Sequence, residues 1–369
     1  MRHTSPLLIQ VVPQLKPGRC GVTDHVIQLA SELKCAFGIG SAFVVLNSNE
    51  RCDLPYPIIY CDQENLLESC LALSEGGPGA VLVHVSGYGY SPDGAPTRLA
   101  DALSRVRENG SFDIAAFFHE ISATGAPWTS AFWHTHRQQR AIRKIAEQCD
   151  LMVTNMDAHA QWLERETKRR PGAPIRLLPV LSTIGEARDR TPLAKRTATM
   201  TVFGLPGTRQ RAFRELSRLP GFLGALRIDN ILDIGAGSDF PDKLHGITVR
   251  HRGELDVLEI AEGLSQSTFG YLSYTPSYLA KSSIFAAYCS HGTIPVIATP
   301  FAGELDGLRD GVHLLSPKTV DAASASGLER CSIQAWDWYT GHRIHVHAET
   351  YAHWLNHPAL EHEREEVKR

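Results

Sequence analysis

The chain has 369 residues, more than a single hydrophobic core usually organises, so we expect two domains. Hydrophobic residues make up 43% and charged residues 21% of it, a balance that excludes disordered and fibrous classes. The net charge of -3 argues against sequence-independent nucleic-acid binding, because proteins of that kind are usually strongly basic. We therefore expect no nucleic-acid partner.

The start of the chain does not resemble an export signal. Its apolar run, Leu7–Val12, is too short and contains Gln10. No uninterrupted apolar stretch reaches transmembrane length. The eight cysteines include no CxxC pair, which in a chain this long indicates mostly buried thiols of a cytosolic protein. These features predict a cytoplasmic location, while peripheral membrane association and the oligomeric state stay open.

The first half of the chain alternates apolar strand-like runs with amphipathic helical segments. The expected strands are Leu7–Val12, Ala42–Leu46, Ile58–Tyr60, Ala80–Val85, Ile114–Phe118 and Leu151–Thr154. The expected helices are His25–Leu33, Glu64–Leu73, Thr97–Arg107, Ala131–Cys149 and His159–Arg169. This alternation predicts a parallel sheet covered by helices.

A polar, charge-rich segment, Glu186–Thr199, indicates a linker before the alternation resumes. The expected elements beyond it are strands Thr199–Phe203, Asn230–Ile234, Ile247–His251, Phe269–Leu272 and Pro295–Ala298, with helices Thr208–Leu219, Val257–Gln266 and Ser282–Cys289. The sequence therefore predicts an α/β protein with two doubly wound, Rossmann-like domains, 1–190 and 191–335, and a C-terminal segment, 336–369. In such sheets ligands bind at the carboxyl ends of the strands, so we expect the site in a crevice there.

A glycine-containing loop, Pro17–Val22, joins the first expected strand to the first helix. Glycine permits close backbone approach, and a helix N-terminus offers N–H groups to an anion. Gly21 is therefore a candidate for binding a diphosphate. A tight turn capped by Thr23 or Asp24 would give the same pattern.

A histidine and a glutamate, His119 and Glu120, end the buried strand Ile114–Phe118. Side chains at such a strand end lie at the expected crevice, and imidazole can bond a sugar hydroxyl or a phosphate at neutral pH. We therefore take His119 as the candidate catalytic residue and Glu120 as a candidate acceptor ligand. A hydrogen-bonded structural histidine is the alternative, and it is the favoured interpretation for His84 in mid-strand.

A glycine and two arginines mark the start of the second domain. Gly204 ends an expected strand, and Arg209 and Arg211 open the following helix. Arginine binds diphosphate in a bidentate manner, and positive charge at a helix start opposes the helix dipole. This placement favours an anionic ligand over a solvated helix start.

A second polar cluster precedes the apolar helix Ser282–Cys289. Lys281, Ser282 and Ser283 bring an ammonium group, hydroxyls and backbone N–H groups to one helix N-terminus, which makes a phosphate cradle. Ser282 acting only as an N-cap is the alternative.

Aromatic side chains follow two strands of the first domain, at Tyr88, Tyr90, Trp128 and Trp133. Aromatic faces stack on the C–H faces of sugar rings, so we take Tyr88, Tyr90 and Trp128 as candidate acceptor ligands. Packing between loops is the alternative.

The order of these elements resembles the GT-B glycosyltransferases, in particular the retaining family 4 group. The matching features are the glycine loop Pro17–Val22, the Phe118-His119 strand end, a basic residue at Arg209 or Arg211, the run Gly292–Val296 that resembles a Gly-x-Pro-Val strand start, and the C-terminal Trp336–Tyr339 with its helix. The resemblance covers nearly the whole chain through loose motifs.

The resemblance implies two Rossmann-like domains that face a cleft, with the acceptor in domain 1–190, the donor in domain 191–335 and a C-terminal helix that crosses back. It implies transfer of a sugar from a nucleoside-diphosphate sugar to an acceptor in glycan or polysaccharide biosynthesis, with neither cofactor nor metal. The family also has two glutamates that contact the sugar and the ribose. Leu279 and Ala287 stand at those positions here, so both carboxylates of the motif are missing.

Two other functions stay open: an epimerase of GT-B fold acting on a nucleotide sugar, and a non-catalytic sugar- or nucleotide-binding protein. The missing glutamates favour the second. The 17 histidines include no HExxH motif, so we expect no metal site. No Gly-x-Ser-x-Gly elbow is present, which argues against a hydrolase.

Overall fold

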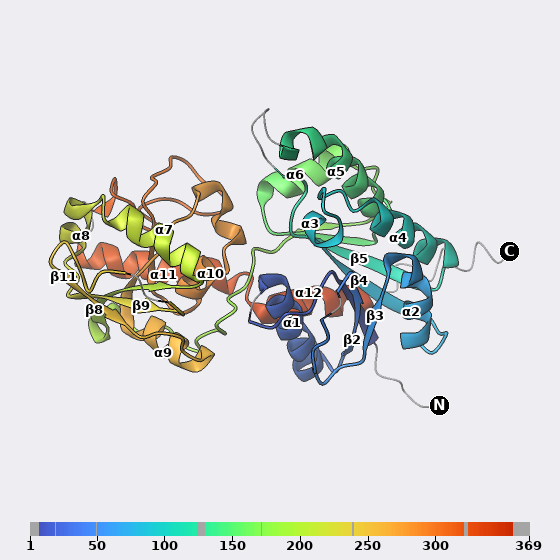
Figure 1. The fold of residues 1–369 in the computed structure, drawn as a ribbon, viewed down its shortest axis with the longest axis horizontal. Coiled ribbons are helices and arrows are strands. Elements are labelled where there is room, and N and C mark those ends of the chain that lie inside the picture. Colours follow the sequence, from blue (N-terminus) through green and yellow to red (C-terminus); the bar gives the residue numbers. More distant parts are fainter. Residues whose placement is uncertain are drawn as a thin grey trace. The chain divides into compact units, whose positions relative to one another are not determined.

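The computed structural model describes residues 7–18, 20–48, 50–123, 130–170, 172–237, 240–320 and 324–356, apart from the side chains of 130–133. The chain forms two compact units (Figure 1). The first comprises Met1–Pro179 and Ile344–Arg369, and the second comprises Val180–Arg343.

The first unit is built on a seven-stranded parallel sheet. Its strands are β1 (Leu7–Val12), β2 (Gly40–Leu46), β3 (Ile58–Cys61), β4 (Gly79–Val85), β5 (Phe112–Phe118), β6 (Leu151–Thr154) and β7 (Ile175–Leu177). Their order is β3-β2-β1-β4-β5-β6-β7, so β1, β4 and β5 are neighbours at the centre. Continuous apolar runs make these central strands, because both faces of the sheet are covered.

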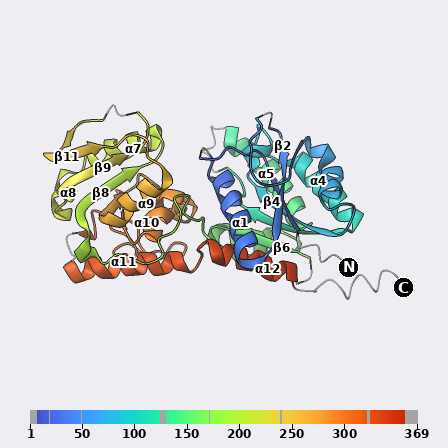
Figure 2. The same cartoon turned by 90° about the horizontal axis from the view of Figure 1, so that it is seen from below.

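Helices cover both faces of this sheet. They are α1 (Gly21–Phe37), α2 (Leu66–Leu73), the single turn α3 (Gly87–Tyr90), α4 (Thr97–Asn109), α5 (Ser130–Ala146), α6 (Asp157–Glu166) and α12 (Ile344–Asn356), with a 3-10 turn at Gln63–Asn65. Leu99 of α4 and Ile142 of α5 belong to the core on one face. Leu29 of α1 and Tyr351 of α12 belong to the core on the other, where α1 and α12 lie side by side (Figure 2).

The second unit has a six-stranded sheet of order β10-β11-β9-β8-β12-β13. Its strands are β8 (Thr197–Phe203), β9 (Asn230–Ile234), β10 (Lys243–Leu244), β11 (Ile247–His251), β12 (Ser267–Tyr271) and β13 (Ile294–Val296). Its helices are α7 (Pro206–Leu216), α8 (Pro220–Leu226), α9 (Val257–Gln266), α10 (Ser283–Ser290) and α11 (Ala325–Thr340), with 3-10 turns at Leu193–Lys195 and Pro276–Lys281. Only the β10–β11 pair among these strands is antiparallel.

Both sheets with their helices confirm the predicted α/β class. The end of the predicted helix Thr208–Leu219 differs in the structure. The helix α7 ends at Leu216, and a new helix, α8, begins at Pro220. Proline suits a first helical position, where its missing N–H would have no partner. Within the described part of the chain, no helix combines the length and the apolar character that crossing a bilayer requires.

The polar segment after Pro179 packs onto the second unit. The backbone N–H of Ser182 donates to the Tyr339 hydroxyl at 3.0 Å, and Arg190 forms an ion pair with Glu329 on α11. At the other end, His347 of α12 lies 3.1 Å from the Pro179 carbonyl oxygen of the first unit. The units therefore divide at 179/180 and 343/344, whereas the sequence pattern placed boundaries at 190/191 and 335/336.

Candidate functional site

Three polar side chains form a row across the central strands of the first unit. Gln10 lies on β1, His84 on β4, and His119 follows β5 directly. The His119 backbone N–H donates to the Val85 carbonyl at 3.0 Å, which extends the β4–β5 ladder by one residue. His84 lies 3.1 Å from Gln10 Oε1 through Nε2 and 3.3 Å from His119 Nε2 through Nδ1. His119 is 7% exposed and ends this row at the carboxyl edge of the sheet.

Two further histidines, His25 on α1 and His347 on α12, pack around this row. The His25 ring centroid lies 5.7 Å from that of His84 and 5.1 Å from that of His347. Burial lowers the pKa of His25 to about 4, and burial followed by the nearby His25 holds the pKa of His84 well below its usual value. These two rings are therefore neutral at physiological pH. Within the described residues no three His, Cys, Asp or Glu side chains are placed to hold a metal ion.

The glycine loop before α1 is closed by its own side chains. Asp24 Oδ1 accepts a hydrogen bond from the Gly18 N–H at 2.7 Å, and partial burial raises the pKa of this carboxyl. Thr23 Oγ1 accepts from the Lys16 N–H at 3.1 Å. Gly21 begins α1, and a Cβ there would meet no atom within 4 Å. The Asp24 carboxylate already complements the positive end of the helix dipole, so the predicted diphosphate contact at Gly21 has a negative neighbour.

The two tyrosines of α3 point in different directions. Tyr90 is buried, and its hydroxyl donates to the carbonyl oxygens of Val11 (3.2 Å) and His84 (3.1 Å). Tyr88 is 49% exposed, and its hydroxyl oxygen accepts a hydrogen bond from Gln138 at 3.4 Å. Of these two predicted acceptor ligands, Tyr90 uses its hydroxyl to bond main-chain carbonyl groups, and Tyr88 is exposed to solvent.

A cavity of about 630 Å³ lies beside α3. Tyr88, Asn47, Gln63, Arg98 and Arg137 are among the residues that line it. Four of these side chains were not predicted: Asn47 and Gln63 follow β2 and β3, Arg98 lies on α4 and Arg137 on α5. They are too far apart in the sequence to form a local motif. The other predicted acceptor residues are Glu120, half-buried beside His119, and Trp128, which lies outside the described residues.

Arg209 lies inside the second unit rather than on its surface, with 0% exposure. Its Nη1 donates to Asp233 Oδ1 at 2.8 Å, and its Nε donates to the Gly204 carbonyl at 3.1 Å. Its Nη2 donates to the carbonyl oxygens of Ala236 and Gly237. These bonds use four of the five N–H donors of a guanidinium group. Arg209 thus joins the loops after β8 and β9. Only one N–H group of its guanidinium remains for the predicted direct contact with a diphosphate.

Arg211 is the exposed arginine of the predicted pair. Its side chain forms no hydrogen bond or ion pair with any residue described in the structure. It lies two residues after Arg209 in α7, so the same short segment holds one structural and one solvent-facing cation. The sequence pattern predicts the same role for both arginines, whereas in the structure Arg209 is buried and Arg211 is exposed.

The start of α10 brings several predicted residues together. Ser282 is the N-cap, and its Oγ accepts from the Phe285 N–H at 3.2 Å. Ser283 is the first helical residue, and Lys281 Nζ lies 5.8 Å from the centroid of the Tyr278 ring. Gly204 adjoins this helix end, because a Cβ there would lie 3.1 Å from Ile284 Cδ1. Backbone N–H groups, hydroxyls and an ammonium group therefore meet the end of β8 here, and this arrangement suits an anion.

Leu279 and Ala287, which stand at the two family glutamate positions, are both buried. They are 1% and 0% exposed and belong to an apolar cluster with Phe285 and Tyr288. A carboxylate at Ala287 would be surrounded by apolar groups, an unfavourable setting for a charge.

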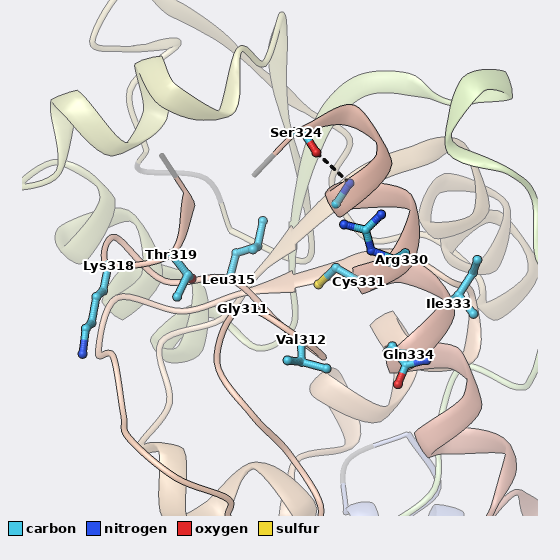
Figure 3. Close-up of a pocket in the computed structure, with 11 residues that line it drawn as sticks. Gly311, Val312, Leu315, Lys318, Thr319, Ser324, Arg330, Cys331, Ile333 and Gln334 are labelled. Atoms are coloured by element: carbon cyan, nitrogen blue, oxygen red, sulfur yellow. Dashed lines mark hydrogen bonds between the residues drawn. The ribbon is translucent and has the colours of Figure 1, made fainter. Parts of the chain in front are cut away.

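A second cavity of about 460 Å³ lies between α11 and the segment 311–319 (Figure 3). Lys318, Arg330 and Cys331 are among its lining residues. Ser324 Oγ caps α11 at its mouth by accepting from the Gly327 N–H at 3.2 Å. None of the site residues predicted from the sequence lines this cavity.

No protein-family model and no curated protein sequence matches this chain. Solved structures do match it over nearly its whole length. An alpha-glucosyltransferase in complex with UDP and a 13-mer DNA is 12% identical, with a TM-score of 0.60, and the match covers 95% of this chain and 99% of that one. A trehalose-6-phosphate structure from E. coli bound with UDP-2-fluoro glucose is 11% identical, with a TM-score of 0.58 and coverage of 95% and 98%. The pneumococcal O-GlcNAc transferase GtfA in complex with UDP and GlcNAc is 9% identical, with a TM-score of 0.56 and coverage of 96% and 99%.

These neighbours are GT-B glycosyltransferases that bind UDP or UDP-sugars. Some of them are DNA complexes, which is not in line with the expectation of no nucleic-acid partner drawn from net charge. A net charge averages over the whole surface and does not describe a local binding face. At these identities the likeness establishes architecture alone, and on it the chain has the GT-B fold.

Proposed function

We propose that this chain is a glycosyltransferase that moves a sugar from a nucleoside-diphosphate sugar to a hydroxyl acceptor. The observation that carries the proposal is the start of α10, where Lys281, Ser282 and Ser283 meet Gly204 at a strand end of a GT-B fold. In a doubly wound sheet this is the edge at which ligands bind. The arrangement supports a diphosphate site in the second unit.

In this proposal the second unit stabilises the leaving diphosphate. The Lys281 ammonium group, the Ser283 hydroxyl and the N–H groups at the start of α10 supply positive potential where negative charge develops. Arg211 adds an exposed cation from α7. Arg209 acts indirectly by holding the loops after β8 and β9 in place through its carbonyl contacts.

The first unit takes the hydroxyl-bearing group in this proposal. His119 stands at the carboxyl end of β5, with Glu120 next to it. Tyr88 offers an exposed aromatic face for a sugar ring. Tyr90 and Gly21 support the neighbouring loops, and Trp128 stays a predicted acceptor ligand.

The finer features of the proposal follow from the sequence resemblance. We propose a retaining, family 4-type enzyme that works without cofactor or metal in glycan or polysaccharide biosynthesis. All eight cysteines are free thiols, which supports the reducing cytoplasm as its location. Leu279 and Ala287 replace the family carboxylates, so the sugar and ribose contacts must come from other groups.

A thermal-shift screen tests the donor site first. Nucleoside diphosphates and nucleotide sugars are added to the purified chain without metal, and a ligand of the native state raises Tm by mass action. We expect a selective rise for one base and its sugar conjugates, and a smaller rise in Lys281→Ala. Lys243→Ala, on the distant strand β10, is the matched control and should respond as the wild type. No rise with any nucleotide contradicts the proposal.

Turnover separates the proposed transferase from the two other candidate functions. The selected nucleotide sugar is incubated with a panel of sugar acceptors, and products are followed by mass spectrometry. Release of nucleoside diphosphate that depends on an acceptor supports transfer. Conversion of the nucleotide sugar without an acceptor identifies an epimerase, and binding without any conversion identifies a non-catalytic protein.

A further inference from the structure

The cavity beside α3 in the first unit is lined by polar and charged groups from several segments. Its volume of about 630 Å³ lies in the range of small-molecule sites, about 300–1,000 Å³. Asn47 and Gln63 reach it from the ends of β2 and β3, Arg98 from the first turn of α4, and Arg137 from α5. No carboxylate is among the residues that the structure shows lining it. This lining has a positive charge, which favours an anionic ligand.

The two arginines of the cavity differ in the partners that they already have. Arg137 Nη1 lies 3.1 Å from Asp93 Oδ2. The other oxygen of Asp93 accepts from the Ser91 hydroxyl at 2.6 Å and from the Ala95 N–H at 3.0 Å, so this carboxylate also holds the loop before α4. Arg98, in contrast, forms neither an ion pair nor a hydrogen bond with any residue that the structure describes. Its guanidinium group is therefore the cation that is available to a ligand.

The start of α4 adds backbone donors beside Arg98. Pro96 is the N-cap residue and has no side-chain cap bond, and the first turn contains no acidic residue. Asp101, in the second turn, pairs with Lys144 at 3.5 Å. The first N–H groups of a helix have no partner within the helix and carry positive potential. Since Pro96, Thr97 and Arg98 all line the cavity, an anion there meets these N–H groups and the guanidinium group together.

The cavity also has a buried hydrogen-bond acceptor without a partner. Gln63 is 6% exposed, and its Nε2 donates to the Tyr90 carbonyl at 3.0 Å, which leaves Oε1 with no partner in the described part of the chain. An unsatisfied buried acceptor is unfavourable unless a ligand donates to it. The terminal torsion of glutamine is soft, and Asn47 Nδ2 also donates to the Tyr90 carbonyl at 3.0 Å. Gln63 Oε1 can therefore turn to a hydroxyl group in the cavity.

We propose that this cavity binds an acidic sugar, a ring that carries a phosphate or a carboxylate group. The anion binds Arg98 and the N–H groups at the start of α4, a ring hydroxyl donates to Gln63 Oε1, and the exposed ring of Tyr88 packs against the sugar. A neutral sugar leaves Arg98 without a partner, and a simple carboxylate leaves Gln63 without a donor. Both features are met by one ligand that has hydroxyl groups and a negative charge.

This role rests on the proposed transferase function and defines the class of its acceptor. Tyr90, which lines the cavity, belongs to the core on the face with Leu99 of α4 and Ile142 of α5. The strand end at His119 belongs to the other face, because His119 stacks on Phe117, which lies in the core under α1 and α12. The cavity is therefore additional to the site at His119, and it selects an acceptor by a group other than the reacting hydroxyl.

Isothermal titration calorimetry of the full chain tests the cavity without donor or turnover. Glucuronate and glucose 1-phosphate are the acidic probes and differ in their anion, whereas glucose supplies the ring alone and acetate the charge alone. We expect at least one acidic probe to bind roughly tenfold more tightly than glucose or acetate, and the tighter of the two identifies the anion. Acidic probes that bind no more tightly than glucose or acetate, or not at all, overturn the proposal.

Three variants assign the binding to this cavity. Arg98→Met should weaken binding of the acidic sugar by roughly ten- to hundredfold, because a hydrogen bond to a charged group is lost. Arg105→Met, an exposed position on the same helix that does not line the cavity, is the matched control and should bind as the wild type. Gln63→Leu should weaken binding by roughly fivefold through the lost hydroxyl contact. Arg98 is exposed, so its variant stays a valid test even if Gln63→Leu does not fold, and an unchanged Kd in Arg98→Met overturns the proposal.

Turnover separates this site from the proposed function. Transfer from the selected nucleotide sugar should favour the acidic acceptor, and Arg98→Met should raise its KM by roughly ten- to hundredfold while the Kd of the nucleoside diphosphate stays unchanged. If the wild type binds the acidic sugar and transfers nothing, the proposed function fails while the site stands. If it transfers sugar with a KM that Arg98→Met does not change, the acceptor assignment is wrong while the proposed function stands.

Discussion

Each unit buries one polar network beneath the ends of its parallel strands, and the two networks differ in charge. In the first unit the neutral side chains Gln10 and His84 form a hydrogen-bonded row with His119. In the second unit Arg209 and Asp233 form an ion pair at 2.8 Å that also holds loop carbonyl groups. The row in the first unit links side chains of three neighbouring strands, whereas the ion pair in the second unit holds loops in place. This difference is in line with the proposed hydroxyl-binding face on one unit and the proposed anion-binding face on the other.

The largest expected effect breaks the ionic network. Asp233→Asn leaves the fully buried Arg209 without a counter-charge, and breaking a buried pair in this way costs about 3–5 kcal/mol. Urea unfolding of the variant should report this loss. Asp229→Asn, an exposed aspartate just before the same strand, is the control and should lie within about 0.5 kcal/mol of the wild type. Equal losses in the two variants would show that the pair does not hold the unit together.

His25, which packs against this row, predicts a pH dependence of stability in the first unit. Burial lowers the pKa of His25 from 6.5 to about 4 in the folded state, so between these values the unfolded state binds a proton that the folded state does not. Stability from this group is complete above pH 6.5 and declines as pH falls towards 4. The difference of 2.5 units amounts to about 3 kcal/mol.

His25→Leu isolates this effect, because leucine does not titrate. Urea unfolding of the wild type and the variant is compared at pH 7 and pH 4.5. The stability of the wild type should fall more steeply by about 2–3 kcal/mol over this range. Parallel pH profiles would mean that His25 is protonated in the folded chain or solvated within it.

The proposed diphosphate site at the start of α10 predicts a loss of affinity rather than of stability. Lys281→Met should weaken binding of the nucleoside diphosphate by roughly ten- to hundredfold, because a hydrogen bond to a charged group contributes about 1.5–3 kcal/mol. Isothermal titration calorimetry measures the change. Added salt should weaken binding in the wild type more than in the variant, since screening acts on the lysine charge. An unchanged Kd would place the diphosphate elsewhere.

The fold could be predicted because its signals are local. Apolar runs and helical spacing give most elements within a few residues, as in Leu7–Val12 and Asn230–Ile234. The short strand β7, Ile175–Leu177, was not predicted, because three residues at a sheet edge carry no period. The expected helix Thr208–Leu219 extends beyond the end of α7, because the sequence pattern does not show that Pro220 begins a new helix.

The candidate sites were harder to predict because the local sequence pattern does not determine the order of the strands in a sheet. The period-two pattern places His84 and His119 on one face of their strands, but only the order β1-β4-β5 brings Gln10 to them. Likewise, the segment Arg209-Gln210-Arg211 does not indicate that the first arginine pairs with Asp233. Residue type predicted the chemistry, and the partner from another strand decided whether a side chain is a ligand or a support.

The smallest expected effects separate the two tyrosines of α3. Tyr90→Phe removes a buried hydroxyl that donates to the carbonyl groups of Val11 and His84, so unfolding should require about 1 kcal/mol less free energy. Tyr88→Ala changes an exposed side chain, so its stability should stay within about 0.5 kcal/mol of the wild type while acceptor affinity falls. Urea unfolding and acceptor KM are measured for both variants. The opposite pattern, with Tyr90→Phe affecting KM alone, would place the acceptor on the buried ring. Such a result would connect the acceptor to the row Gln10–His84–His119, because the Tyr90 hydroxyl donates to the backbone carbonyl of His84.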